Sequence, residues 1–375
     1  MSAYYLDIHV LQSVPPSNVN RDDTGAPKSA LYGGVRRARV SSQAWKKAVR
    51  NAFKEILPPD ERGARTLRVV ELIMNSLRDH HPEVPGDQRQ DRALAVVKAL
   101  GLKAEKRKKK DESGSEPIEQ TQYLVFYSTR QIDRLADLAA ASDGKVSGRD
   151  AKAAADSDHG IEVALFGRMV ADSKDLNVDS AVQVAHAIST HAVETESDYF
   201  TAVDDYKLDE DDAGAGMIGN VEFNSSTLYR FATVDLTELG HNLGDPEMAA
   251  KAAMAFAQGF ILSMPSGKQN TFANSTFPDA VAVQLRQGRS SSFVGAFEDA
   301  VPNTGKGFVE ASCSALATYA TQSEKAFLGA PIASFVTHVG ERTSAVESMG
   351  TDLPLDELLD RTREAVSAVL VKVES

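Results

Sequence analysis

The sequence has a single cysteine, Cys313, among its 375 residues. One cysteine cannot form an internal disulfide, so the disulfide-stapled class of secreted domains is excluded and a reducing, cytoplasmic location is expected. No run of about 18 apolar residues could span a membrane, and no N-terminal apolar run has the form of a signal peptide. The most apolar segment, residues 248–264, carries Lys251 and Gln258 and is expected to be a core helix.

Acidic side chains are missing from residues 24–54, although they outnumber basic ones in the whole chain. The formal net charge is −12, from 53 Asp and Glu against 41 Lys and Arg. The cations of the acid-free segment are Lys28, Arg36, Arg37, Arg39, Lys46, Lys47, Arg50 and Lys54. A purely basic stretch in an acidic protein indicates a surface for a polyanion, most often nucleic acid. The alternative is a solvated basic face that pairs with acids elsewhere in the fold.

The residue order in this segment predicts a turn followed by a capped helix. Gly33-Gly34 predicts the turn, and Ser41 and Ser42 supply hydroxyls for capping. Residues 43–53 have helical periodicity, with an apolar side and a basic side. Lys46 and Arg50 are one turn apart on the basic side, so they could follow a phosphodiester backbone beside the helix N-terminus.

The remaining patterns predict an α+β fold. Alternation predicts strands at residues 4–11, 123–127, 227–236 and 280–285. Residues 13–27 are rich in turn formers, including Pro15-Pro16. Periodicity predicts helices at residues 179–190, 247–264 and 355–371. Residues 191–223 have the pattern of a long β-hairpin with an acidic tip at 204–212, and the Lys-rich segment 103–116 is expected to be an exposed loop. A ferredoxin-like (RRM-like) sandwich with two insertions fits this order.

Several motifs, taken in order along the chain, resemble one known family. They are residues 8–11, 20–23, 28, 33–34, 36–43, 46, 162–169, 185–191, 198–205 and 265–271. As a set they resemble the CasC family, the backbone subunit of the type I-E CRISPR surveillance complex, Cascade. The resemblance implies a hand-shaped α+β protein. An RRM-like (ferredoxin-like) palm would comprise residues 1–59 and 224–375, a helical fingers insertion residues 60–190, and a thumb β-hairpin residues 191–223.

The resemblance also implies a function and partners. Copies of a non-catalytic subunit would polymerise along one CRISPR guide RNA, together with other Cascade subunits. Each thumb would displace one guide nucleotide in six, so that the guide pairs with target DNA in short segments of five. Cutting would fall to a recruited helicase-nuclease. The family implies no cofactor, metal or membrane.

The expected RNA-binding residues come from these motifs and from the basic helix. They are Asn20, Arg21, Lys28, Ser41, Ser42, Gln43, Lys46, Arg50, Arg168, Met169, Tyr199, Phe200, Lys268 and Gln269. Lys268 and Gln269 lie in a glycine-containing loop that can approach an RNA backbone. Tyr199 and Phe200 would wedge into the base stack, with Met169 opposite them. Without the resemblance, the two aromatic residues would be expected in a core and Arg168 in a salt bridge.

The acidic tip of the hairpin is expected to avoid phosphates, because like charges repel. Residues 204–212 should point away from the RNA of their own subunit and meet a basic surface on a neighbouring copy. Lys28, Arg36 and Arg37 are the candidates for that surface.

Catalytic motifs give weaker alternatives. Residues 265–271 contain Gly-Lys but lack the upstream glycine of a P-loop, and His186 and His191 lack a zinc-hydrolase pattern. The strongest enzymatic alternative is a metal-dependent RNA nuclease related to type III backbone subunits, which cut RNA with a loop aspartate. Asp22 and Asp23 could hold Mg²⁺ near a phosphate. A generic RRM-like messenger-RNA binder is a third class, but residues 4–11 lack the RNP aromatic signature.

Overall fold

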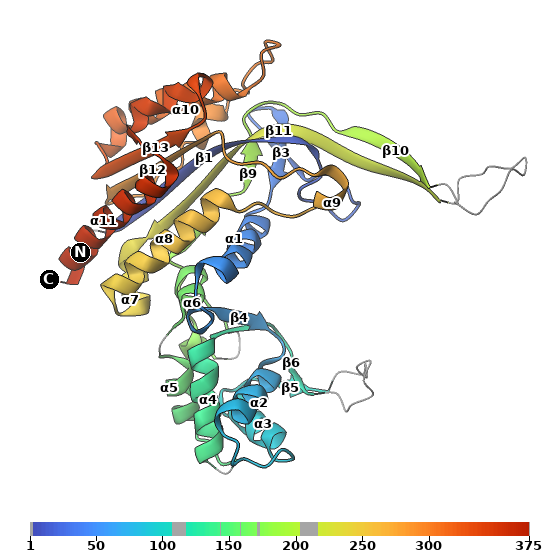
Figure 1. Ribbon diagram of the computed structural model, residues 1–375, viewed down its shortest axis with the longest axis vertical. Coiled ribbons are helices and arrows are strands. Elements are labelled where there is room, and N and C mark those ends of the chain that lie inside the picture. The colour runs from blue at the N-terminus through green and yellow to red at the C-terminus, as the bar shows by residue number, and fades with distance from the viewer. Residues whose placement is uncertain are drawn as a thin grey trace, which may run out of the picture. The chain divides into compact units, whose positions relative to one another are not determined.

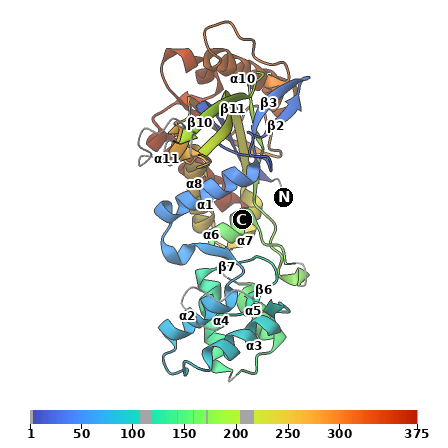
Figure 2. The same ribbon diagram turned by 90° about the vertical axis from the view of Figure 1, so that its right-hand side faces the viewer.

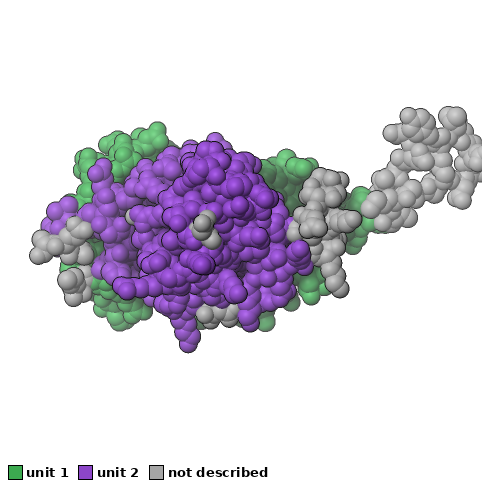
Figure 3. Space-filling view, turned by 90° about the horizontal axis from the view of Figure 1, so that it is seen from below, with its two compact units in different colours: residues 1–52, 183–233, 256–368 green, residues 53–182, 234–255, 369–375 purple. Residues whose placement is uncertain are grey.

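The structure is a computed structural model that describes residues 3–106, 118–142, 144–157, 159–170, 173–202 and 217–374. It has an α+β fold with one large central sheet. The chain divides into two compact units (Figure 3). Unit 1 comprises residues 1–52, 183–233 and 256–368, and unit 2 comprises residues 53–182, 234–255 and 369–375.

The central sheet has the strand order β14-β13-β12-β1-β11-β9-β3-β2, and both β8 and β10 also pair with β11 (Figure 1). The strands are β1 Tyr4–Ser17, β2 Ser29–Tyr32, β3 Val35–Val40, β8 Val182–Val184, β9 Ala187–Ser189, β10 Glu196–Ala202, β11 Met217–Asp235, β12 Ala280–Gln287, β13 Ala333–His338 and β14 Thr351–Asp352. β1 and β12 are antiparallel, with Ile8 opposite Val283. The predicted strands at 4–11, 227–236 and 280–285 are therefore confirmed.

Helices cover both faces of this sheet. α10 Val309–Ser323 packs on one face, and α1 Ser42–Ile56 packs on the other. The other helices outside the insertion are α7 Leu236–Leu243, α8 Pro246–Leu262, α9 Gln269–Phe272 and α11 Leu355–Glu374. The segments η3 Val294–Phe297 and η5 Glu341–Met349 are 3-10 helices, and η4 Glu324–Leu328 is a π-helix. The predicted helices at 43–53, 247–264 and 355–371 are confirmed.

Alternation along β11 assigns its side chains to the two faces of the sheet. Tyr229 and Phe231 belong to the core cluster that includes α10, and Leu228 belongs to the cluster of Trp45 on α1. On this second face α1 and α8 lie side by side (Figure 2), with the Trp45 ring centroid 6.4 Å from that of Phe260. The buried Arg230 guanidinium stacks 3.8 Å from the Trp45 ring centroid.

Unit 2 contains the helical insertion. Its elements between residues 59 and 176 are η1 Pro59–Glu61, β4 Gly63–Thr66, α2 Val69–His80, α3 Arg89–Ala99, β5 Ala104–Glu105, β6 Gln120–Thr121, β7 Val125–Ser128, α4 Thr129–Ala141, α5 Gly148–Ala155, α6 Ile161–Phe166 and η2 Lys174–Leu176. Ile73, Val96 and Leu135 are among the side chains of its core. Ser128 and Gln131 form a capping box at the start of α4.

The structure corrects two sequence predictions. Residues 179–190 were predicted as a helix, but they hold β8 and β9. The branched side chains of Val182, Val184 and Ile188 favour strands, and β9 completes the ladder between β11 and β3. β1 also continues through Pro15-Pro16, which were predicted as a turn. Both prolines are exposed, where a strand tolerates the missing N–H groups.

Two predicted features fall largely outside the described residues. They are the acidic tip at 204–212 and residues 107–116 of the Lys-rich segment. Among the helices that the structure describes, none has the length and apolar character needed to cross a membrane.

Candidate nucleic-acid interface

A groove of about 810 Å³ opens on unit 1, and five residues of the N-terminal motifs line it: Asn20, Arg21, Lys28, Ser41 and Gln43. Three segments form its walls: the loop after β1, the first turns of α1 and the loop after α8. The lining residues are Val19, Asn20, Arg21, Lys28, Ser41, Gln43, Ala44, Lys47, Ala48, Asn51, Ala52 and residues 263–268. The structure thus brings together six of the predicted RNA-binding residues: Asn20, Arg21, Lys28, Ser41, Gln43 and Lys268.

The loop after β1 is held in shape by its own polar side chains. The buried Asn18 side-chain amide donates to the Gly25 carbonyl and to the Glu222 carbonyl of β11, each at 2.9 Å. The Asn20 side-chain oxygen accepts from the Ser41 amide at 2.9 Å. Asn18 therefore ties the loop to the hairpin, and Asn20 ties it to the start of α1.

Helix α1 presents its N-terminal turns to the groove. Ser41 is the N-cap, since its hydroxyl accepts from the Ala44 amide at 3.3 Å. Gln43, Lys47 and Asn51 follow at four-residue spacing, so they stand above one another along the groove. A helix N-terminus beside a lysine is a favourable site for phosphate.

Four predicted residues on α1 and at the start of α9 lie outside the groove lining. Ser42, Lys46 and Arg50 are half-buried on α1, and Gln269 is exposed as the first residue of α9. Residues 46 and 50 are one position, about 100°, around the helix from Lys47 and Asn51. Contact of these four residues with RNA stays a prediction.

The loop after α8 approaches the end of β1 very closely. A Cβ atom at Gly267 would lie 2.0 Å from the Val19 carbonyl oxygen, so only glycine fits at this position. The next residue, Lys268, has a φ of 51°, a left-handed conformation that is rare for lysine. The two loops are therefore packed backbone against backbone, with Lys268 fixed at the rim of the groove.

The groove is basic. Its lining includes four cations, Arg21, Lys28, Lys47 and Lys268, and no acidic residue is among the described lining residues. The other polar side chains there are amides and hydroxyls. Such a set binds phosphate oxygens and offers no paired reader of base edges.

The long hairpin formed by β10 and β11 carries the predicted aromatic pair (Figure 1). Tyr199 is opposite Asn220 and Phe200 is opposite Gly219. Adjacent strand residues point to opposite faces, so the two rings cannot enter one base stack together. They are 64% and 37% exposed, which removes both from the core.

Phe200 faces the loop after α8. It lies on the same face of the hairpin as Phe223. Its cross-strand partner Gly219 is four residues from Phe223 on β11, and residues an even number apart on a strand share a face. The Phe223 ring centroid lies 5.8 Å from that of Phe272 on α9. A Cβ at position 219 would lie 2.3 Å from the Phe200 ring, so Gly219 makes room for this side chain.

Comparison with known proteins assigns the family. A family model described as "CT1975-like protein" matches residues 6–361. The chain belongs to this CT1975-like family of Cas proteins. A solved chain from a "CRISPR RNA-guided surveillance complex, pre-nicking" is 34% identical, with a TM-score of 0.84 over 96% of this chain and 100% of that chain. Another, from a "CRISPR RNA-guided surveillance complex", is 28% identical, with a TM-score of 0.73 over 96% and 99%. Curated proteins gave no match.

In this Cas protein, Arg168 is a structural residue. Its side chain is buried, and it donates to the carbonyls of Leu176 at 2.6 Å and Ala155 at 3.1 Å. Its guanidinium also lies 5.2 Å from the Tyr127 ring centroid. Its Nη2 also lies 3.4 Å from an Asp156 carboxylate oxygen, which is the salt bridge expected without the resemblance. The buried guanidinium shapes the loop, and contact of Arg168 with RNA stays a prediction. The neighbouring Met169 is 81% exposed, so it is Met169 that the loop presents.

Arg37 corrects an expectation from the sequence. It was a candidate for the basic surface that meets a neighbour's acidic tip, but it is fully buried. Its guanidinium donates to carbonyls of Tyr32, Ser189, Thr190, Phe297 and Glu298 at 2.8–3.2 Å. It joins the β2–β3 hairpin to distant segments of unit 1. Arg36 is exposed, and Lys28 is half-buried.

Asp22 shapes the loop in which it lies. Its Oδ1 accepts from the Thr24 amide at 2.9 Å, the Thr24 hydroxyl at 2.7 Å and the Ala26 amide at 3.0 Å. These bonds lower the pKa of Asp22, and the bond with the Thr24 hydroxyl has the largest effect. Among the described residues, Asp22 and Asp23 belong to no group of three or more His, Cys, Asp or Glu side chains close enough to share an ion.

Proposed function

We propose that this Cas protein is the non-catalytic backbone subunit of a type I-E CRISPR surveillance complex, and that its groove holds the phosphate backbone of the guide RNA. The observation that carries the proposal is the basic groove itself. Family motifs from residues 20–28, 41–43 and 265–268, far apart in the sequence, meet in it. The similarity to chains of RNA-guided surveillance complexes supports the guide RNA as the ligand.

The strand order supports an RRM-like palm. The neighbouring strands β12-β1-β11-β9 follow the order 4-1-3-2 of a ferredoxin-like sheet. α1 lies between β1 and β9 in the sequence, and α8 lies between β11 and β12, which are the two helix positions of that fold. The groove lies at the start of one of these helices and the end of the other. The thumb is the hairpin of β10 and β11, and the fingers lie in unit 2.

The groove chemistry supports binding without sequence preference, because its cations and amides match phosphates. Copies of the chain, the other Cascade subunits, the target DNA paired with the guide and the recruited helicase-nuclease are the partners that this role requires. The role does not require catalysis by this chain. Oδ1 of Asp22 already accepts three hydrogen bonds within its own loop.

A charge-matched pair of double variants tests the groove. Lys28→Gln with Lys268→Asn removes two cations that line it, and asparagine tolerates the left-handed backbone at 268. We expect weaker guide-RNA binding and a log K against log salt slope that falls by roughly 1.4, about 0.7 for each lost phosphate contact. Both quantities come from binding titrations at several salt concentrations.

The control is Lys306→Gln with Lys325→Gln, which removes the same charge from exposed positions outside the groove. It should keep the wild-type slope. Equal losses in the two double variants would mean that net charge, and not the groove, governs binding. A preference among spacer sequences would contradict phosphate recognition.

A further inference from the structure

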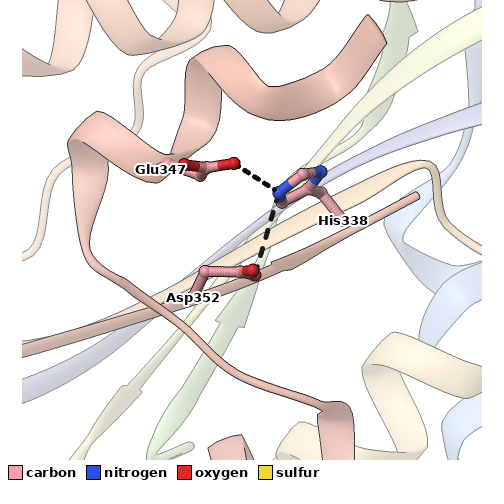
Figure 4. A group of neighbouring side chains, drawn as sticks. All are labelled: His338, Glu347 and Asp352. Carbon is pink, nitrogen blue, oxygen red and sulfur yellow. Dashed lines mark hydrogen bonds and ion pairs between the residues drawn. The ribbon is translucent and has the colours of Figure 1, made fainter. Parts of the chain in front are cut away.

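Three side chains converge near the end of β13, and none of them lines the groove (Figure 4). His338 ends β13, Glu347 lies on η5 and Asp352 lies on β14. The His338 Nε2 lies 3.1 Å from a Glu347 oxygen and 3.8 Å from an Asp352 oxygen. All three ligand atoms lie within 4.8 Å of one another.

The second ring nitrogen fixes the orientation of His338. Its Nδ1 lies 3.2 Å from the Gly340 carbonyl oxygen and 3.0 Å from the Thr343 hydroxyl. That hydroxyl lies 2.9 Å from the Val339 carbonyl, to which it donates, so it accepts from the ring. Nδ1 therefore carries a hydrogen. In the neutral ring, the lone pair of Nε2 then faces two carboxylates, an arrangement that either a bound cation or a proton on Nε2 would relieve.

We propose that His338, Glu347 and Asp352 bind a divalent transition-metal ion of the zinc type. Zinc ligands lie about 2.0–2.2 Å from the ion, so a tetrahedral site separates them by about 3.4 Å. The separations of 3.1 and 3.8 Å bracket this value. A backbone carbonyl on the far ring nitrogen is the usual outer partner of a metal-bound histidine. The carboxylates are 54% and 51% exposed, so water can take the fourth position.

The ion would link the edge strand β14 to the neighbouring strand β13. β14 has two residues, and it pairs with β13 through Phe335–Thr351 and Val336–Asp352. The ligands come from β13, the C-terminal part of η5 and β14, so one ion would join these three elements. A site that is complete only in the folded chain adds its binding free energy to folding. The role is structural and does not depend on RNA binding.

A protonated His338 holding both carboxylates without a metal is the competing explanation. The chain offers a matched comparison in unit 2. His81 also contacts two carboxylates, but Glu83 lies 3.0 Å from Nδ1 and Asp137 lies 2.8 Å from Nε2. Carboxylates on opposite sides of a ring cannot share one ion with it. The His81→Gln variant therefore serves as a control, since it removes a histidine that contacts two carboxylates outside the proposed metal site.

Calorimetry and thermal unfolding on the full-length, tag-free, metal-stripped chain test the proposal, with Zn²⁺ and Co²⁺ as probes. The wild type should bind one ion tightly, and saturating Zn²⁺ should raise its Tm. His338→Gln should weaken binding more than about tenfold, beyond the loss of an outer-shell partner, and should abolish the visible Co²⁺ bands of a tetrahedral site. His81→Gln should bind like wild type.

Glu347→Gln keeps the test decisive if His338→Gln fails to fold, because Glu347 is half-exposed. It should fold and still lose affinity. No saturable binding by the wild type would overturn the proposal and leave an ion pair. Equal losses in the His81 and His338 variants would overturn it too.

Discussion

At the scale of single residues, the basic segment 24–54 holds cations with different tasks. Lys28 and Lys47 line the groove, whereas Arg37 is buried among backbone carbonyls. Composition predicted the polyanion surface but could not separate these residues. The acceptors of Arg37 lie as far away as Phe297, and no local pattern shows such a contact. Lys47 was missed because the basic side of α1 was centred on Lys46 and Arg50, one position away.

His9 gives a prediction on pH. Its Nδ1 lies 2.9 Å from the Tyr229 hydroxyl, which also accepts from the Phe293 amide at 2.9 Å. Burial lowers the pKa of His9 to about 3. The unfolded chain, with a pKa of about 6.5, therefore takes up this proton first. Stability from His9 is complete above about pH 6.5 and falls toward pH 3, by up to about 1.4 kcal/mol per pH unit.

Urea unfolding of wild type and His9→Gln between about pH 7.5 and pH 5 measures this slope. The variant should have a flatter pH dependence below pH 6.5, whatever its stability at neutral pH. His241→Gln, an exposed control, should keep the wild-type slope. An unchanged slope in His9→Gln would show that His9 is not the group that titrates.

At the scale of elements, local sequence patterns predicted the helices and strands that neighbouring residues determine. Alternation predicted the hairpin, and periodicity predicted α1, because both are properties of neighbouring residues. The close approach of Gly267 to Val19 joins segments that are remote in sequence. Nothing near residue 267 predicts that approach, so the sequence could place Lys268 in a loop but not at a groove. The burial of Arg168 could not be predicted for the same reason, since it depends on the packing of unit 2.

The two faces of the thumb give a second prediction. Phe200 faces the loop after α8 and Tyr199 faces away from it. Phe200→Ala should therefore remove the wedge from the guide, at a cost of about 1–3 kcal/mol for each base stack lost. Chemical probing of the assembled guide should show a distorted base at every sixth position in wild type. Phe200→Ala should weaken that period.

Tyr199→Ala is the matched control for the hairpin, since it removes an exposed ring from the next residue. It should leave the period close to wild type. If Tyr199→Ala erases the period and Phe200→Ala does not, the assignment of the faces is reversed. If neither changes it, the hairpin does not insert an aromatic side chain.

At the scale of the whole molecule, the sequence predicted the α+β class and the Cas relationship, since family motifs recur along most of the chain. The pairing of β1 with β12 follows from no local pattern, since most of the chain separates the two strands. Residues 183–190 were predicted as part of the fingers; they contain β9, which pairs with β3 and β11.

The whole chain is expected not to cut nucleic acid. The purified protein with Mg²⁺ or Mn²⁺ should leave RNA and single-stranded DNA intact. Gel electrophoresis of the nucleic acid after hours at high protein concentration measures this, with a known nuclease as a positive control. Metal-dependent cleavage that disappears in Asp23→Asn would falsify this expectation. The same loss in Asp22→Asn would be harder to interpret, because Asp22 also holds the loop.

The most direct test of the central claim is ultraviolet cross-linking of the protein purified from cells that transcribe a CRISPR array. Mass spectrometry identifies the linked peptides, and sequencing identifies the linked RNA. We predict one guide RNA of uniform length, linked to peptides that contain residues 19–28, 41–52 and 263–268. Mixed cellular RNA on these peptides, or guide RNA linked only to peptides outside the groove, would contradict the account.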